Sequence, residues 1–283
     1  MTRTALALGL TAVLMAGSSA VSAAEAWRLG GFDVPESVVF DADNSRLIVS
    51  NIVGEATEAD GNGTLSLVSL DGAMIDADWV TGLDAPKGSA IAGGKLYVAD
   101  LTNLRIVDLA SGAVETLAIE GATFLNDVTA DAAGTIYVTD TFANRIYAVA
   151  GNEAALFVED AALDSPNGIL ADGDSLLIAS FGTLAAKPED MVPGGLVRVD
   201  IATKAVSVVE GAEKIGFLDG IVKIGDAYVV SDFFGGAIWR ITSGSAPETL
   251  ATLAMGSADI GSDGEAIYVP MMMEGELVKL TLE

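Results

Sequence analysis

Six polar or charged residues recur at one place in a repeated sequence phrase, and most of them carry oxygen atoms that bind metal ions. The phrase is plainest at residues 165–180 (SPNGILADGDSLLIAS), where proline, asparagine and glycine precede two apolar runs. Carboxylate and amide oxygens, without histidine or cysteine, suit hard cations such as Ca²⁺. Aligning the copies on their second apolar run places six residues in equivalent positions: Glu36, Lys87, Asn126, Asn167, Asp219 and Asp259.

These residues carry unbalanced negative charge, since three carboxylates against one ammonium group leave a formal sum of −2. Carboxylates in a partly dehydrated channel repel one another, and a divalent cation would make the sum zero. Ca²⁺ accepts six to eight oxygens in flexible geometry, whereas Mg²⁺ requires a stricter octahedron. We therefore expect Ca²⁺, with Mg²⁺ as the weaker candidate. The alternative is that Asn-Gly and Asp-Gly are ordinary turn dipeptides here. The expected protein ligands are Glu36, Asn126, Asn167 and Asp219.

The repeats predict the fold that would bring these residues together. They are about 45 residues apart, and short strands repeated at that spacing are typical of propeller blades. No segment of a dozen residues beyond the N-terminus has helical periodicity. We predict an all-β, six-bladed propeller over residues 24–283, with blades that begin near residues 35, 86, 125, 166, 218 and 257.

One strand precedes the first repeat, and the last repeat is one strand short. Pairing residues 26–31 with residues 276–282 would close the last blade with the N-terminal strand. Two repeats also carry insertions between their second and third strands, at residues 51–63 and 180–194. In blades opposite each other, these insertions would overhang the channel mouth as two flaps and form a small-molecule site. The alternative is that they are decorative loops.

Residues 1–23 have the features of a secretory signal peptide. Arg3 is their only charge, residues 5–16 are apolar, and residues 21–23 (VSA) supply small side chains for cleavage. The apolar run is shorter than the about 20 residues that a membrane span needs. The prediction is a periplasmic or secreted protein with no membrane contact after cleavage. A retained membrane anchor is the alternative.

Composition excludes several kinds of chemistry. Cysteine and histidine are both absent, which excludes thiolate and imidazole metal sites and any nucleophile that is paired with histidine. The net charge of −26 repels nucleic acid and anionic lipid. Catalysis would have to come from carboxylates, amides, lysine, tyrosine or a hard cation.

These residues resemble the calcium-dependent six-bladed propellers of the senescence marker protein 30, gluconolactonase and diisopropylfluorophosphatase type. Residues 35–41 (PESVVFD) look like the family's first-blade metal glutamate, residues 125–128 (LNDV) and 166–169 (PNGI) like its asparagines, and residues 218–221 (LDGI) like its aspartate. The resemblance implies hydrolysis of lactones or related esters. It also implies one catalytic Ca²⁺, for which Zn²⁺ or Mn²⁺ often substitutes, held by Glu36, Asn126, Asn167 and Asp219.

The sequence departs from this family at the place of a substrate contact. Sugar lactonases of the family usually carry an arginine two residues before the third-blade asparagine, where this chain has Phe124. This difference argues against recognition of an aldonolactone's hydroxyl groups. Two interpretations of Lys87 stay open: it replaces that arginine as a cationic substrate contact, or it pairs with Asp259.

The predicted function is an exported, Ca²⁺-dependent hydrolase of a small lactone or ester, in which the cation polarises the carbonyl. Asp219 is the candidate general base, and Asn126 and Lys87 are candidates for positioning the substrate. The alternative is a non-catalytic propeller that binds a small ligand or a partner protein and keeps the metal as a structural element. An enzyme would leave open coordination positions under the flaps, whereas a binding module would fill them with protein oxygens.

Overall fold

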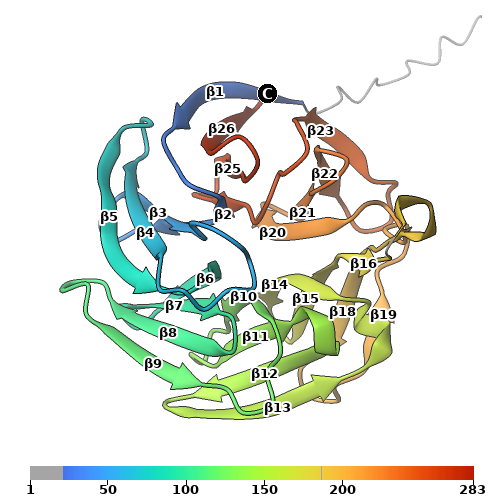
Figure 1. The fold of residues 1–283 in the computed structure, drawn as a ribbon. Coiled ribbons are helices and arrows are strands. Elements are labelled where there is room, and N and C mark those ends of the chain that lie inside the picture. Colours follow the sequence, from blue (N-terminus) through green and yellow to red (C-terminus); the bar gives the residue numbers. More distant parts are fainter. Residues whose placement is uncertain (1–21, 186) are drawn as a thin grey trace, which may run out of the picture.

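The computed structural model describes residues 22–185 and 187–283, and in them six four-stranded antiparallel sheets are arranged around a central axis (Figure 1). The predicted all-β, six-bladed propeller is confirmed. The signal-peptide prediction concerns residues 1–23, and residues 1–21 lie outside the described part of the chain. No helix in the described residues is long and apolar enough to cross a membrane.

In the first five blades the strands run outward from the axis in chain order. Blade one consists of β2 (Pro35–Asp41), β3 (Arg46–Asn51), β4 (Gly63–Ser69) and β5 (Met74–Leu83). Blade two consists of β6 (Pro86–Ala92), β7 (Lys95–Asp100), β8 (Asn103–Asp108) and β9 (Val114–Ala118). Blade three consists of β10 (Leu125–Ala130), β11 (Ile136–Asp140), β12 (Arg145–Ala150) and β13 (Glu153–Glu159).

The next two blades follow the same plan. Blade four consists of β14 (Pro166–Asp172), β15 (Ser175–Ser180), β18 (Leu196–Asp200) and β19 (Val206–Val208). Blade five consists of β20 (Leu218–Ile224), β21 (Ala227–Asp232), β22 (Ala237–Ile241) and β23 (Glu248–Thr252). Short 3₁₀ turns, η1 (Thr141–Ala143) and η2 (Ala161–Leu163), connect strands in blade three and lead into blade four.

Blade six is assembled from both ends of the described chain. Its order from the axis is β24 (Gly261–Ser262), β25 (Ala266–Met271), β26 (Glu276–Leu282) and β1 (Ala23–Gly30). The register of β1 and β26 runs from Ala23 opposite Leu282 to Gly30 opposite Glu276. The predicted closure of the last blade by the N-terminal strand is therefore confirmed.

The hydrophobic core is divided into six layers, one between each pair of neighbouring blades. The layer between blades two and three, for example, joins Leu104 and Ala99 to Leu125 and Val138, all with less than 1% of their surface exposed. The five other clusters each combine residues of two successive blades in the same way. Because both faces of every blade pack against a neighbour, the strands are rich in buried β-branched and leucine side chains. The channel along the axis is left for polar groups.

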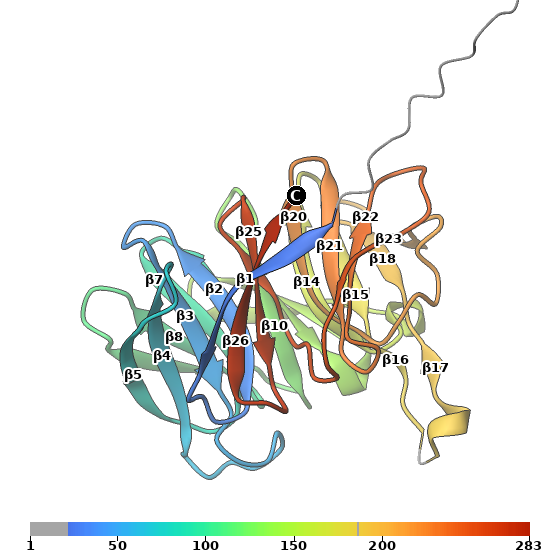
Figure 2. The ribbon, with the colours of Figure 1, turned by 90° about the horizontal axis from the view of Figure 1, so that it is seen from above.

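Both insertions lie between second and third strands, as predicted, and they emerge on the same face of the ring (Figure 2). We call residues 51–63 flap one and residues 180–194 flap two. Flap two contains the two-stranded sheet of β16 (Gly182–Thr183) and β17 (Val192–Pro193) and the 3₁₀ turn η3 (Pro188–Asp190).

Candidate functional site

A cavity of about 230 Å³ opens on the flap-bearing face of the channel. Five of the six predicted ring residues line it, and each has at most 6% of its surface exposed. They come from the inner strands of the first five blades: Glu36, Lys87, Asn126, Asn167 and Asp219. The structure therefore brings all four predicted metal ligands to one place, with Lys87 beside them.

A β-bulge aims these side chains at the axis. In blade two, Pro86 lies opposite Asp100 and Ser89 opposite Val98, so the inner strand carries one extra residue at the position of Lys87. The same register shift occurs near the start of the inner strand in blades one, three, four and five. A bulge redirects a side chain out of the regular pleat. The sequence analysis missed this device because a one-residue shift leaves no periodic signal.

Aspartates at the ends of second strands hold the turns that lead into the bulges. Asp140 accepts hydrogen bonds from the backbone N–H groups of Thr123 and Phe124, at 2.8 and 2.9 Å. Asp100 does the same for Ala85, at 2.7 Å, and Asp232 for Phe217, at 3.0 Å. In blades two, three and five these carboxylates fix the entry of the inner strand, and so the depth of the ring residue that follows.

Four of the ring oxygens have no hydrogen-bond partner. Seven buried side-chain nitrogen and oxygen atoms in the described residues are unpaired, and four of them are Glu36 Oε2, Asn126 Oδ1, Asn167 Oδ1 and Asp219 Oδ1. Burying a polar atom without a partner is costly, so native proteins rarely do it without a reason. The unpaired oxygens are the four expected of a calcium site, two carboxylates and two amides. The residues present therefore fit a hard cation.

This donor set contains fewer acids than many metal centres. No group of three or more His, Cys, Asp or Glu residues in metal-binding proximity occurs in the described residues. Ca²⁺ accepts amide oxygens as well as carboxylates, and Asn126 and Asn167 supply them. Two acids and two amides would leave the remaining coordination positions to water or substrate.

The prediction for Asp259 was wrong in its register. Asp259 forms a parallel bridge with Ser37. In the other blades, the residue that precedes the ring position pairs with the last residue of the second strand, as Pro35 does with Asn51. In blade six, Ser257 makes this pairing with Met271. The residue equivalent to Glu36 in blade six is therefore Ala258. Because alanine has no polar side chain, the alignment of the repeats assigned the sixth ring position to the neighbouring residue, Asp259. The first ring is thus Glu36, Lys87, Asn126, Asn167, Asp219 and Ala258, and it carries two carboxylates rather than three.

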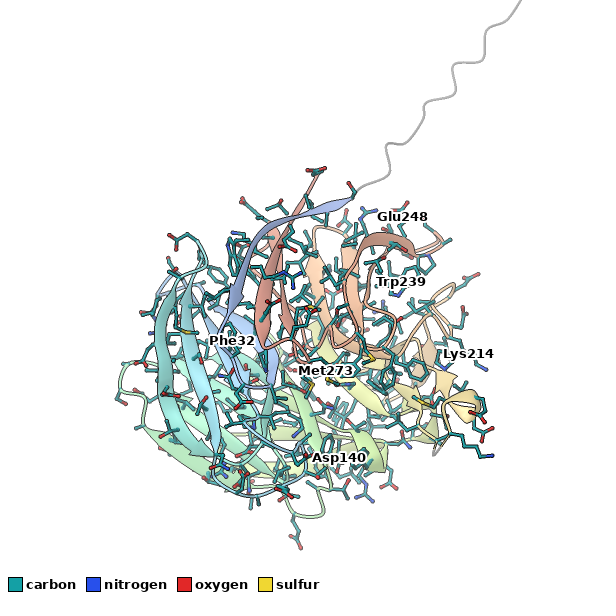
Figure 3. All side chains as sticks on the ribbon, turned by 45° about the horizontal axis from the view of Figure 1, so that its top comes forward. Phe32, Asp140, Lys214, Trp239, Glu248 and Met273 are labelled. Atoms are coloured by element: carbon teal, nitrogen blue, oxygen red, sulfur yellow. The ribbon has the colours of Figure 1, made fainter. Side chains whose placement is uncertain are left out.

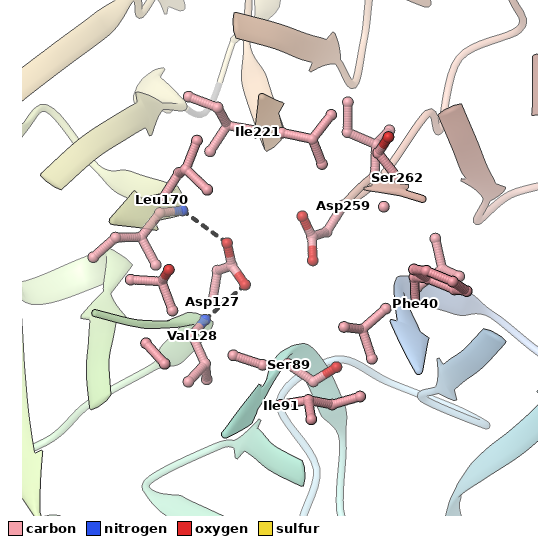
Figure 4. Close-up of a pocket in the computed structure, with 18 residues that line it drawn as sticks. Phe40, Ser89, Ile91, Asp127, Val128, Leu170, Ile221, Asp259 and Ser262 are labelled. Atoms are coloured by element: carbon pink, nitrogen blue, oxygen red, sulfur yellow. Dashed lines mark hydrogen bonds between the residues drawn. The ribbon is translucent and has the colours of Figure 1, made fainter. Parts of the chain in front are cut away.

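Asp259 belongs to a second ring, one residue further along each inner strand. This second ring is Ser37, Gly88, Asp127, Gly168, Gly220 and Asp259. Asp127 and Asp259 point into the channel from blades three and six and line a deeper cavity of about 300 Å³ (Figure 4). Asp127 accepts hydrogen bonds from the backbone N–H groups of Val128 and Ile169, at 2.6 and 2.7 Å. Asp259 accepts one from the Ser37 hydroxyl at 2.5 Å.

Lys87 is fully committed to protein groups. Its ammonium donates to the carbonyl oxygens of Ala85, at 2.8 Å, and Ala56, at 3.1 Å, and lies 4.5 Å from the centre of the Phe124 ring. No ion pair joins it to Asp259 in the described residues. Of the two interpretations of Lys87, the pairing with Asp259 is therefore wrong. Because Ala56 lies in flap one, Lys87 holds that flap over the cavity.

Burial and mutual repulsion shift the pKa values of the channel acids. Burial raises the pKa of Glu36 well above its ordinary value, Asp219 and Asp259 raise it further, and Lys87 opposes this. Burial and then Asp259 likewise raise the pKa values of Asp219 and Asp127. Burial raises the pKa of Asp259 to about 7. A bound divalent cation would reverse this balance for the carboxylates that touch it.

We call the cavity of about 230 Å³ on the flap-bearing face the upper cavity. Its walls come from a second position that recurs in the repeats. In five of the six blades the residue that directly follows the second strand lines the cavity: Ile52, Thr141, Phe181, Phe233 and Met272. Phe124, Phe142, Leu184 and Ala56 complete the walls. Phe124 and Phe142 stack with ring centres 4.3 Å apart, and Phe181 packs on Phe217 and Phe233 at 5.8 and 6.0 Å. Aligning the ends of the second strands would have revealed this wall from the sequence.

No protein-family model and no curated protein matches the sequence. Solved structures share the fold at low identity. A gluconolactonase of Xanthomonas campestris is 16% identical, with a TM-score of 0.68 over 90% of this chain and 88% of that one. Virginiamycin B lyase of Staphylococcus aureus with quinupristin is 14% identical, with a TM-score of 0.64 over 93% and 100%. A chain of a nidogen/laminin complex is 16% identical, with a TM-score of 0.61 over 78% and 80%. These likenesses show a fold shared by proteins of several functions.

Proposed function

We propose that this protein is a Ca²⁺-dependent hydrolase of a small lactone or ester. The observation that carries the proposal is the set of four unpaired, buried oxygens at the floor of an open cavity. A module that kept a metal only for structure would surround it with protein oxygens. Here a fifth ring residue is Lys87 and the sixth is Ala258, so the described protein offers no further side-chain oxygen in the first ring.

The likeness to the gluconolactonase supports this reaction over that of the lyase. The lyase structure is of a histidine-to-alanine variant described as catalytically inactive, and this chain contains no histidine. A reaction that needs an imidazole is closed to it. Hydrolysis at a hard cation needs only carboxylate and amide ligands and a base.

Four of the ring residues have a definite part in the proposed reaction. The cation, when bound by Glu36, Asn126, Asn167 and Asp219, supplies polarisation of the carbonyl and stabilisation of the oxyanion. The unpaired Oδ1 of Asp219 would bind the cation, and the other oxygen of the same carboxylate accepts a proton from the attacking water. The water oxygen joins the acyl carbon, the acyl C–O bond breaks, and the leaving oxygen takes up the proton to give a hydroxy acid or an acid and an alcohol.

Two measurements test the proposal. Calcium added after chelator treatment should raise the melting temperature, since a ligand at a hundredfold excess over its Kd stabilises the folded state by about 2.7 kcal/mol. Asp219→Ala should abolish this rise, whereas Asp226→Ala, at an exposed turn of the same blade, should keep it. Simple γ- and δ-lactones and aryl esters should be hydrolysed with calcium and not in chelator. No response to Ca²⁺, Mg²⁺, Mn²⁺ or Zn²⁺ would contradict the site. A calcium response without turnover of any substrate would favour the binding-module alternative.

The proposal includes export through the signal peptide at residues 1–23. Cleavage after Ala23 would remove one residue of β1 and leave Ala24 to Gly30 paired with β26. The sixth blade would therefore stay closed in the mature protein. N-terminal sequencing of the protein from the periplasm or medium should begin at Ala24. Intact residues 1–23 on that protein would contradict the cleavage.

A further inference from the structure

The walls of the upper cavity offer a ligand no free hydrogen-bond donor from a side chain. Thr141 is the only wall residue in the described protein whose side chain carries a polar hydrogen, and in the ring at the floor such hydrogens are carried by Lys87, Asn126 and Asn167. The Thr141 hydroxyl donates to the carbonyl oxygen of Pro166 at 2.8 Å. The Lys87 ammonium donates to two backbone carbonyls and faces the Phe124 ring. Both residues are therefore already satisfied.

The remaining wall is apolar, and four of its eight residues in the described protein are phenylalanines. Phe124 and Phe142 form one stacked pair, and Phe181 and Phe233 belong to a cluster of four phenylalanines with Phe217 and Phe234. A substrate hydroxyl that enters this wall would lose its hydrogen bonds to water and gain none. A methylene group would instead gain up to about fourfold in binding when fully buried. The wall thus discriminates between polar and apolar substituents.

Apolar side chains also continue from the cavity onto the outer surface. Phe142 and Leu184 line the cavity and still have 60% and 49% of their surface exposed. Phe234, which packs on Phe181, and Met273, which follows the wall residue Met272, are 38% and 61% exposed. Met273 lies close to the centre of the ring in Figure 3. Large exposed apolar side chains gathered at one site mark a surface that binds apolar groups.

The cavity itself is small. Its volume of about 230 Å³ is below the about 300–1,000 Å³ of most ligand sites. It therefore suits a single small ring, and a longer substituent must lie over the rim. The carbonyl group of such a ligand would then lie at the floor of the cavity, and its apolar substituent would lie at the rim.

We infer that the substrate is a small lactone or ester that carries an alkyl or aryl substituent and no hydroxyl groups on its ring. This inference rests on the proposed hydrolase function. Its carbonyl lies at the first ring, and its substituent lies against Phe142 and Leu184. The product is the corresponding apolar hydroxy acid, or an apolar acid or alcohol.

The first test is a series of lactones that share one ring. With calcium present, kcat/KM should rise at least about tenfold from δ-valerolactone to δ-decanolactone, less than full burial of five methylenes would give because the rim is half exposed. Glucono-δ-lactone should be a poorer substrate than δ-valerolactone. If glucono-δ-lactone is turned over as well as δ-decanolactone, the inference is overturned while the proposed hydrolase stands.

A matched pair of variants locates the effect. Leu184 on flap two and Leu156 on β13 are both leucines with 49% of their surface exposed. Leu184→Gln should lower kcat/KM for δ-decanolactone about threefold or more relative to that for δ-valerolactone. Leu156→Gln should change neither value. Equal effects of the two variants would overturn the placement of the substituent.

A binding measurement separates failure of this inference from failure of the proposed function. The neutral fluorescent probe N-phenyl-1-naphthylamine should bind the calcium-loaded protein, and 2-pentylcyclopentanone should displace it at lower concentration than cyclopentanone. Neither ketone can be hydrolysed. Displacement that Leu184→Gln weakens, without turnover of any lactone or ester, would leave the apolar ligand class standing and refute the hydrolase. Turnover of lactones without any dependence on chain length, together with no ketone binding, would refute the inference alone.

Discussion

The two rings of the channel are one residue apart in sequence and have opposite hydrogen-bonding states. In the first ring, the oxygens of Glu36, Asn126, Asn167 and Asp219 include four without any partner. In the second ring, Asp127 accepts from two backbone N–H groups and Asp259 from a serine hydroxyl. The same residue types are thus left open in one layer and satisfied in the next. Unpaired groups point to a ligand, and paired groups point to structure.

The glycines of the second ring also indicate a structural role for that ring. Three of the second-ring positions are glycines, and a side chain there would meet the next blade. A Cβ atom at Gly88 would lie 2.6 Å from the Cα atom of Asp127, and one at Gly168 would overlap the carbonyl oxygen of Asp219. The second ring therefore brings the inner strands into close contact, which fixes the spacing of the first ring above it.

Exchanging an aspartate for asparagine in each ring should give the largest difference between them. Asp219→Asn keeps one oxygen for the cation but cannot accept a proton from water, so turnover should fall by about a hundredfold or more. Asp127→Asn turns an N–H group toward a backbone donor and should lower stability by about 1–3 kcal/mol. It should leave kcat/KM within about threefold of the parent. The measurements are lactone turnover and thermal unfolding of both variants.

The calcium response is the control for this pair. Both variants should still show a rise in melting temperature on calcium addition, because neither loses all of its side-chain oxygens. Equal losses of turnover in the two variants would mean that the rings do not differ in function.

The fold and five members of the first ring, Lys87 among them, could be predicted because both depend on repetition. Apolar runs at a constant spacing specify blades, and the closure by residues 26–31 follows from counting strands. Glu36, Asn126, Asn167 and Asp219 stand at the same place in their repeats, so their convergence follows from the symmetry of the ring. What repeats in the sequence was visible without coordinates.

The remaining features could not be predicted because they break the repetition or act between repeats. Ala258 has no polar side chain, so the sixth position was assigned to Asp259. The partners of Lys87 include Ala56, a carbonyl in a flap that no other blade shares at that place. The bulges depend on backbone register, which the order of apolar residues does not record. Contacts between blades require the three-dimensional packing of the ring.

Adding one methyl group to the second ring should have the next largest effect. Gly168→Ala places a Cβ atom against the backbone of blade five, where nothing flexible can yield. Overpacking of this kind costs about 1–3 kcal/mol, and the displaced strand carries Asp219, so calcium affinity should also fall. Gly30→Ala is the control, because its Cβ would meet nothing closer than Glu276 Cγ at 3.9 Å. Thermal unfolding with and without calcium measures both effects, and equal stability of the two variants would refute close contact at this ring.

The smallest expected effect concerns the pH dependence of the second ring. Burial raises the pKa of Asp259 to about 7, while the unfolded chain releases the same proton near about 3.9. The protonated carboxyl therefore contributes stability fully below about pH 4, and this contribution is lost as the pH rises through about 7. Asp259→Asn cannot ionise and still offers an acceptor to the Ser37 hydroxyl.

In chelator, the melting temperature of Asp259→Asn relative to the parent should therefore rise between pH 5 and pH 8. Each kcal/mol corresponds to about 2–4 °C in a chain of this size class. The other acids that face the channel, Glu36, Asp127 and Asp219, are present in both proteins, so their titration largely cancels in the difference. A difference in melting temperature that stays constant from pH 5 to pH 8 would show that Asp259 is ionised in the folded protein throughout this range. The hydrogen bond from Ser37 would then be enough to stabilise the ionised carboxylate of Asp259 against the cost of burial. The second ring, like the first, would contain more buried negative charge than the protein cations in the described residues balance.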